Sequence, residues 1–71
     1  MSQRYQDLIV DVSDWQVTFQ ATEQGLIFPV RTIRQADRVI TNYHDLPEAI
    51  KTETMRQARQ QFDNHRLPQQ S

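Results

Sequence analysis

The spacing of apolar residues changes partway along the chain, from alternation to a helical repeat. In residues 15–21 (WQVTFQA), Trp15, Val17 and Phe19 alternate with polar side chains, which predicts a strand with one buried face. Residues 26–33 (LIFPVRTI) are predicted to be its hairpin partner, because Gly25 suits the last position of a short loop. Residues 38–43 (RVITNY) are predicted to form a fourth strand.

Residues 7–12 (DLIVDV) form a short apolar run, and their period is ambiguous. The β-branched residues favour a strand, whereas a helical turn that groups Tyr5 with Leu8, Ile9 and Val12 stays open as an alternative. Ser13 and Asp14 suit a turn after this segment. Pro29 has no backbone N–H, so its strand should have an unpaired side or a bulge at that point.

The last third of the chain predicts one long helix over residues 45–66. Asp45 is placed to cap it, Pro47 fits the first turn, and Glu48 completes a D-x-x-E box. An apolar stripe follows with a spacing of four, which makes it drift around the helix: Leu46, Ile50, Thr54, Ala58 and Phe62. We expect the Tyr43 ring to pack at the helix entry, with its hydroxyl in water.

These elements indicate an α+β fold, a small antiparallel β-meander of three to four strands packed by one long C-terminal helix. Residues 1–71 should form a single small domain, with residues 1–6 and 67–71 frayed because they are polar. The predicted core consists of Trp15, Val17, Phe19, Phe28, Val30, Val39, Leu46 and Ile50.

The length of the helix raises the question of what its far end contacts. Twenty residues span about 30 Å, whereas strands of five to seven residues span about 20 Å. One or two turns should therefore overhang the sheet. Either the stripe crosses a twisted sheet and is all core, or the overhanging part meets a partner. On the second interpretation, the predicted partner-binding residues are Met55, Arg59, Phe62 and Arg66.

The size of the chain favours association with another chain. With 71 residues and no cysteine, it relies on a small core without disulfides. We therefore expect a homodimer. No apolar run approaches the ~20 residues that span a bilayer, and no N-terminal apolar region suggests export. The expectation is a cytoplasmic protein without membrane contact.

Few residues carry catalytic or metal-binding chemistry. The chain has one glycine, no cysteine and one lysine, which excludes Gly-rich phosphate loops and thiol nucleophiles. His44 and Glu48 are spaced as two possible metal ligands, but zinc requires three or four. We predict that the protein is not an enzyme and that it has no metal site and no cofactor.

The arginines suggest an alternative function. Arg31, Arg34 and Arg38 cluster around one predicted turn, as in a small nucleic-acid-binding regulator, although the net charge is −1. Strand alternation would separate Arg31 from Arg34 unless a bulge intervenes. The main hypothesis is a non-enzymatic protein-interaction module, a small adaptor or regulator that docks on a larger protein or on itself through the C-terminal helix and a sheet edge.

Overall fold

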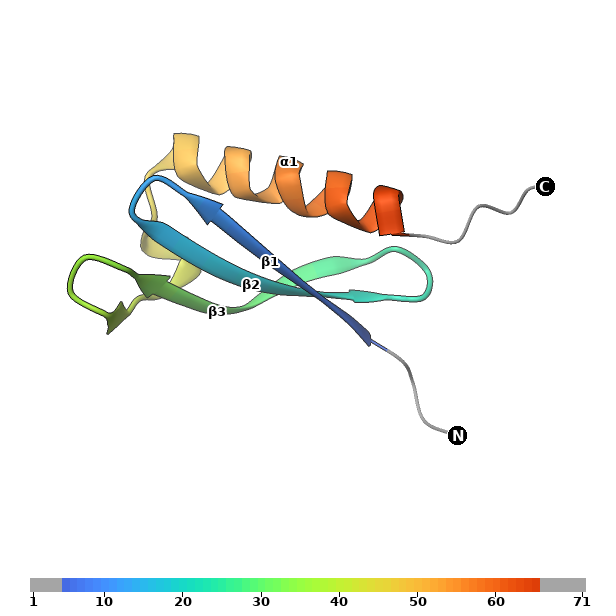
Figure 1. Ribbon diagram of the computed structural model, residues 1–71, viewed down its shortest axis with the longest axis horizontal. Coiled ribbons are helices and arrows are strands. Elements are labelled where there is room, and N and C mark those ends of the chain that lie inside the picture. The colour runs from blue at the N-terminus through green and yellow to red at the C-terminus, as the bar shows by residue number, and fades with distance from the viewer. Residues whose placement is uncertain (1–4, 66–71) are drawn as a thin grey trace.

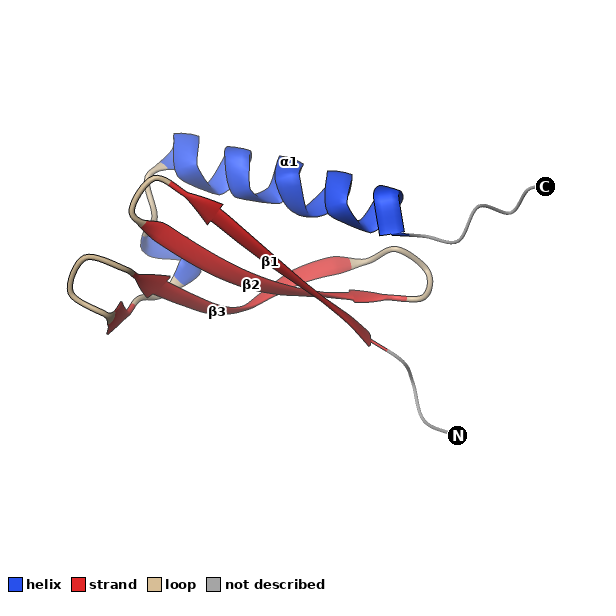
Figure 2. Cartoon of the chain, in the orientation of Figure 1, coloured by secondary structure: helices blue, strands red, loops and turns tan. Residues whose placement is uncertain are grey.

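A computed structural model describes residues 5–65 as a four-stranded sheet that carries one long helix on one side (Figure 1). The strands are β1 (Tyr5–Val12), β2 (Trp15–Thr22), β3 (Ile27–Arg34) and β4 (Val39–Ile40). They are antiparallel and lie in chain order, which is the predicted meander. A 3-10 turn, η1 (Tyr43–Asp45), leads into the helix α1 (Glu48–His65), as Figure 2 shows.

Short turns set the register of the first two hairpins. Ser13 adopts φ 53° in the two-residue turn between β1 and β2, so Val12 lies opposite Trp15. Gly25 has φ 96°, and its N–H donates to the Thr22 carbonyl at 3.0 Å in the β2–β3 loop. The segment 7–12 is therefore a strand, and residues 5 and 6 extend it rather than fray. The other ends expected to fray, residues 1–4 and 67–71, lie outside the described residues.

A bulge interrupts the pairing of β2 with β3. Phe19 lies opposite Pro29, but the preceding residue, Thr18, lies opposite Arg31. Val30 is thus an extra residue on β3, at the site where Pro29 predicted an irregularity. The bulge resets which β3 side chains point to each face of the sheet.

One face of the sheet and the inner face of α1 form the core. Val17 and Phe19 of β2 are fully buried between them. The remaining buried apolar residues come from β1, β2, β3, the approach to α1 and α1 itself: Leu8, Val10, Ala21, Ile27, Leu46, Ala58 and Phe62. Because strand side chains alternate, the residues between these buried positions point to the opposite, uncovered face, which we call the open face.

The core prediction was correct for Val17, Phe19 and Leu46, whereas Trp15 and Ile50 pack at its margin, partly buried. It was wrong for Phe28, Val30 and Val39. The hairpin places Ile27 opposite buried Ala21, so Phe28 faces Gln20 on the open face. Val30 is the bulge residue and is 48% exposed, and Val39 lies at 51% in β4, which has only two residues.

The start of the helix also differs from the prediction. α1 begins at Glu48, and the Pro47 carbonyl accepts its first bonds, from the N–H groups of Ile50 and Lys51. Asp45 belongs to η1 and does not cap α1. The capping side chain is Asn42, which accepts a hydrogen bond from the His44 N–H at 3.0 Å at the start of η1. Leu46 has an extended backbone between η1 and α1, and its side chain is buried in the core.

Candidate functional site

The far end of α1 is packed on the sheet, so the expected overhang is wrong. Ala58 is fully buried and Phe62 is only 5% exposed. The strands are longer than expected, because β1, β2 and β3 each have eight residues. Eight residues span about 26 Å at about 3.3 Å each, which matches about 27 Å for a helix of 18 residues.

Of the residues predicted to bind a partner, Phe62 is buried, Met55 is partly buried and Arg59 is exposed. Met55 packs partly buried against the core. The Nη2 atom of Arg59 donates to the Gly25 carbonyl at 3.3 Å, so this side chain ties the β2–β3 loop to the helix. Phe62 has almost no surface to offer, and Arg66 lies outside the described residues. Partner binding by Met55, Arg59, Phe62 and Arg66 stays a prediction.

The three arginines of the nucleic-acid alternative do not form one patch. Arg31 lies opposite Thr18 on the open face. Arg34 lies opposite Trp15, which is on the covered face of β2 together with buried Val17. The bulge precedes Arg31, so it does not change the separation of these two residues. Arg34 contacts Asp14 at 3.3 Å and Asp37 at 4.0 Å, and its guanidinium lies 5.7 Å from the Trp15 ring centroid.

Arg38 is exposed in the β3–β4 turn, where its φ is 53°. Arg34 is paired with acidic residues, and Arg31 and Arg34 lie on different faces, so the support for a phosphate-binding patch is weaker than the spacing in the sequence suggested. Nucleic-acid binding stays a prediction, and a steep fall in affinity with added salt would identify it.

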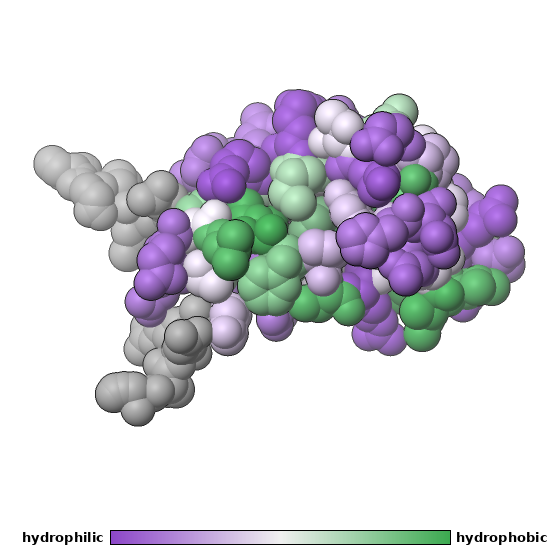
Figure 3. All heavy atoms as spheres, turned by 180° about the vertical axis from the view of Figure 1, so that it is seen from behind, coloured by the Kyte–Doolittle hydropathy of each residue, from purple (hydrophilic) through white to green (hydrophobic). Residues whose placement is uncertain are grey.

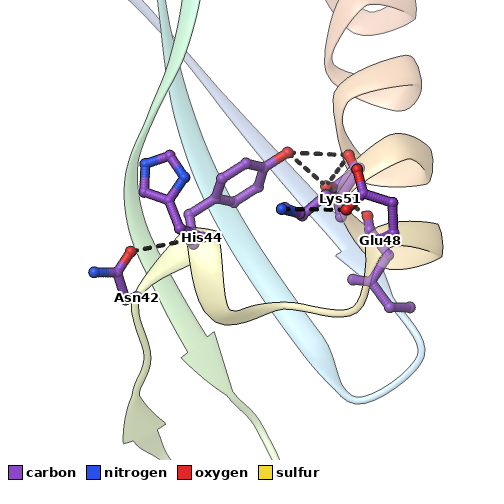
Figure 4. Close-up of polar contacts among 7 residues, drawn as sticks. Asn42, His44, Glu48 and Lys51 are labelled. Atoms are coloured by element: carbon purple, nitrogen blue, oxygen red, sulfur yellow. Dashed lines mark hydrogen bonds and ion pairs between the residues drawn. The ribbon is translucent and has the colours of Figure 1, made fainter.

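The polar cluster at the helix entry has a structural role (Figure 4). The Tyr43 hydroxyl donates to the Lys51 carbonyl at 3.0 Å, and Thr54, which is fully buried, donates to the Ile50 carbonyl at 2.8 Å. The Tyr43 hydroxyl is thus bonded to α1 and does not stay in water as expected. Its ring packs edge-on against Phe19, with centroids 5.7 Å apart, as a residue stapling the helix entry should.

His44 and Glu48 do not converge on a common point. The Glu48 carboxylate pairs with Lys51 at 3.4 Å, and the His44 ring points away from it (Figure 4). Within the described part of the chain, no group of three or more His, Cys, Asp or Glu residues is placed to hold a metal ion. No helix within residues 5–65 is long and apolar enough to cross a membrane.

The surface left uncovered is the open face of the sheet. Ile9 of β1 is 53% exposed and Ile40 of β4 is 69% exposed, and Ile40 lies opposite Ile33. At the other end of this face, the Tyr5 and Phe28 rings pack edge to face with centroids 6.1 Å apart. The side of the molecule opposite Figure 1 also carries several apolar areas among polar side chains (Figure 3).

Polar side chains divide these apolar positions. Gln16, Thr18 and Gln20 form a row along β2, because each alternates with a buried residue. β1 contributes Asp7 and Asp11, on either side of Ile9. The sequence analysis did not single out this surface, although alternation in YQDLIVDV places Asp7, Ile9 and Asp11 on one face once the segment is taken as a strand.

Both edges of the sheet are obstructed to different degrees. On β1, the amide of Gln61 from α1 donates to the Ile9 carbonyl at 2.9 Å, which occupies a main-chain acceptor. On β3, Pro29 and the bulge interrupt the edge, and β4 pairs only with Ile33 and Arg34. Such features reduce strand-to-strand association, so the open face is better suited to docking than either edge.

The open face, with its isoleucines, acidic β1 positions and Arg31, is therefore the candidate functional site. Comparison of the chain with models of known protein families, with curated proteins and with solved structures found no match.

Proposed function

We propose that this protein is a non-enzymatic interaction module, a small adaptor or regulator that docks through the open face of its sheet. The observation that carries the proposal is the exposure of Ile9 and Ile40, at 53% and 69%, on a face that no described element covers. Each large aliphatic side chain transferred from water into an interface contributes about 1.5–3 kcal/mol when fully buried. Apolar side chains that are exposed on one face and bordered by polar ones are compatible with a protein-binding surface.

The apolar stripe on α1 is buried against the sheet, so it is not available to bind a partner, which also favours docking through the open face. Because Ala58 and Phe62 fill the core, the helix stabilises the domain and leaves the other side of the sheet free. The proposal therefore transfers the docking role from the C-terminal helix to the sheet. An antiparallel sheet with one covered and one free face is a stable arrangement by itself, so docking does not require the domain to refold.

A capture experiment with matched charge variants tests this function. The tagged chain is used to retain proteins from an extract of its source cells, after mild crosslinking, together with two double variants. Ile9→Lys with Ile40→Lys places two charges on the open face. Thr52→Lys with Gln60→Lys adds the same charges at exposed positions of α1. Circular dichroism melting confirms that both variants fold.

The expected result is a specific partner, of any sequence, that the open-face variant loses and the helix variant retains. Retention by the open-face variant with loss by the helix variant would overturn the proposal, because it would place the docking surface on α1. Failure of the wild-type chain to retain any protein, itself included, above the level of an untagged control would also overturn it.

A further inference from the structure

The open face carries three charges that no described residue neutralises. The Asp7 and Asp11 carboxylates accept hydrogen bonds from neutral amides, those of Gln20 at 3.0 Å and Gln35 at 3.1 Å. Neither forms an ion pair within residues 5–64, and Arg31 likewise has no ion pair there. Negative charge thus lies along β1 and positive charge lies on β3, on the same face.

Apolar side chains accompany both signs of charge. Ile9 lies between Asp7 and Asp11 on β1, and Ile33 with Ile40 lies one row beyond Arg31. Between the charged strands, β2 presents Gln16, Thr18 and Gln20, whose side chains each both donate and accept hydrogen bonds. The face is therefore acidic and apolar along one border, neutral in the middle, and basic and apolar along the other.

We propose that the partner on this face is a second copy of the chain, related by a two-fold axis that runs parallel to the strands near β2. This inference rests on the proposed function and names its partner. Such an axis places β1 of one copy over β3 of the other and β2 over β2. In a two-fold contact every interaction occurs twice, once in each direction. A face with negative charge on one border and positive charge on the other is therefore complementary to a second copy of itself.

The register makes this pairing specific. Ile9, Thr18 and Arg31 lie in one row across β1, β2 and β3. The two-fold axis therefore places Arg31 of the second copy over Ile9, between Asp7 and Asp11. The aliphatic stem of an arginine covers an apolar residue while its guanidinium reaches a carboxylate. Along β2, the Gln and Thr side chains meet their own copies as mutual donors and acceptors.

The size of the face predicts a weak dimer. Three strands of eight residues and one of two cover a flat area of about 400 Å² at ordinary strand spacings. The two copies together then bury about 800 Å² or somewhat more, at the lower end for specific association. We expect a dissociation constant in the micromolar range that weakens with salt, since the charged contacts lie near the rim.

Exchange of the charges tests the arrangement. Sedimentation equilibrium and light scattering, from micromolar to millimolar protein at low and high salt, give the dimer constant. Asp7→Lys with Asp11→Lys places positive charges opposite Arg31 in both symmetry-related contacts between β1 and β3. Arg31→Glu places negative charges opposite Asp7 and Asp11 in the same two contacts. Each variant alone should weaken dimerisation about tenfold or more. An equimolar mixture of the two should restore it, because all charges in the mixed dimer are opposite.

A control pair makes charge changes of the same two signs elsewhere, one at exposed Asp63 on α1 and one at Arg38 in the β3–β4 turn, as Asp63→Lys and Arg38→Glu. These variants should dimerise like the wild type. Melting curves confirm that each variant is folded. A wild-type monomer at millimolar concentration, or a mixture that fails to recover the dimer, would overturn the inference.

The two proposals can fail separately. If the wild-type chain is a monomer but the Ile9→Lys and Ile40→Lys chain loses a different captured protein, docking through the open face stands and the second copy is wrong. If a dimer forms and ignores every open-face substitution, the second copy on this face is wrong, and the capture experiment alone decides whether another protein docks there.

Discussion

The two faces of the sheet are made from the same strands yet differ in burial and composition. Along β1, Leu8 and Val10 are buried under α1, whereas their neighbour Ile9 is 53% exposed on the other side. The covered face packs against the buried side chains of α1, and the open face holds exposed apolar side chains among Gln, Thr, Asp and Arg. Stability is thus concentrated on one side, which leaves the composition of the other free for recognition.

Coverage of the inner face is itself uneven. α1 contacts β1 and β2, while η1 and the segment around Tyr43 approach β3. The helix runs diagonally over the twisted sheet, as Figure 1 shows, so a single helix reaches from the turn after β1 to the β2–β3 loop. The contact of Arg59 with the Gly25 carbonyl closes that far end. Nothing comparable lies on the open face among residues 5–65.

Removal of a buried side chain at the far end of α1 should have the largest effect on stability. Phe62→Ala removes a ring that is 5% exposed, so it should cost about 3–5 kcal/mol of unfolding free energy. In a domain of this size, most of the stability would be lost. Urea unfolding followed by circular dichroism measures it. A stable Phe62→Ala domain with an altered oligomeric state would return the docking role to the helix.

The β2–β3 loop should show an intermediate effect. A Cβ atom on Gly25 would lie 3.7 Å from Phe62 and 3.8 Å from Arg59, which are ordinary contacts. The φ of 96° is nevertheless unfavourable for other residues, so Gly25→Ala should cost about 1–2 kcal/mol. Gly25→Asn should cost less, because asparagine tolerates positive φ better. Equal losses in both variants would indicate a steric cause, and thermal melting distinguishes the two.

The open face should show a small effect on stability. Ile9→Thr retains β-branching and removes apolar surface that is half exposed, so the unfolding free energy should change by about 0.5 kcal/mol or less. The same substitution should weaken association measured by sedimentation. A loss comparable to that of Phe62→Ala would mean that the open face belongs to the core of an obligate dimer.

The solvent side of α1 should show the smallest effect, visible mainly as a pH dependence. Hydrogen bonds from Arg56 and Gln57 lower the pKa of Glu53 from 4.5 to about 2. The folded chain thus binds this proton less readily than the unfolded chain, so the contribution of Glu53 is present above pH 4.5 and is lost toward pH 2. Since the pair is exposed, the gain is small.

Glu53→Gln should therefore reduce the acid-induced fall in melting temperature between pH 4.5 and 2. An NMR titration of the Glu53 carboxylate measures the pKa directly. A midpoint near 4.5 in the wild-type chain would show that the contact with Arg56 does not persist in solution.

The local sequence pattern was sufficient to predict most of the fold, but it was not sufficient to predict the candidate site. Alternation in residues 15–21, the glycine at position 25 and the fourfold spacing after Leu46 predicted the meander and its helix. Pro29 predicted the irregularity in β3. The burial of Phe62 could not be predicted, because it depends on strand length and sheet twist, which no local period specifies.

Hydrophobic period and turn chemistry act over a few residues, so they specified the kind of most elements and left residues 7–12 open between strand and helix. The fold, in contrast, settled which side chains of β3 face the core, because the bulge at Val30 resets the alternation. It also decided that α1 and the strands have matching lengths, which buries Phe62 and leaves Ile9 and Ile40 exposed. Which side chains are buried depends on contacts between segments that are distant in the sequence, and local patterns do not specify those contacts.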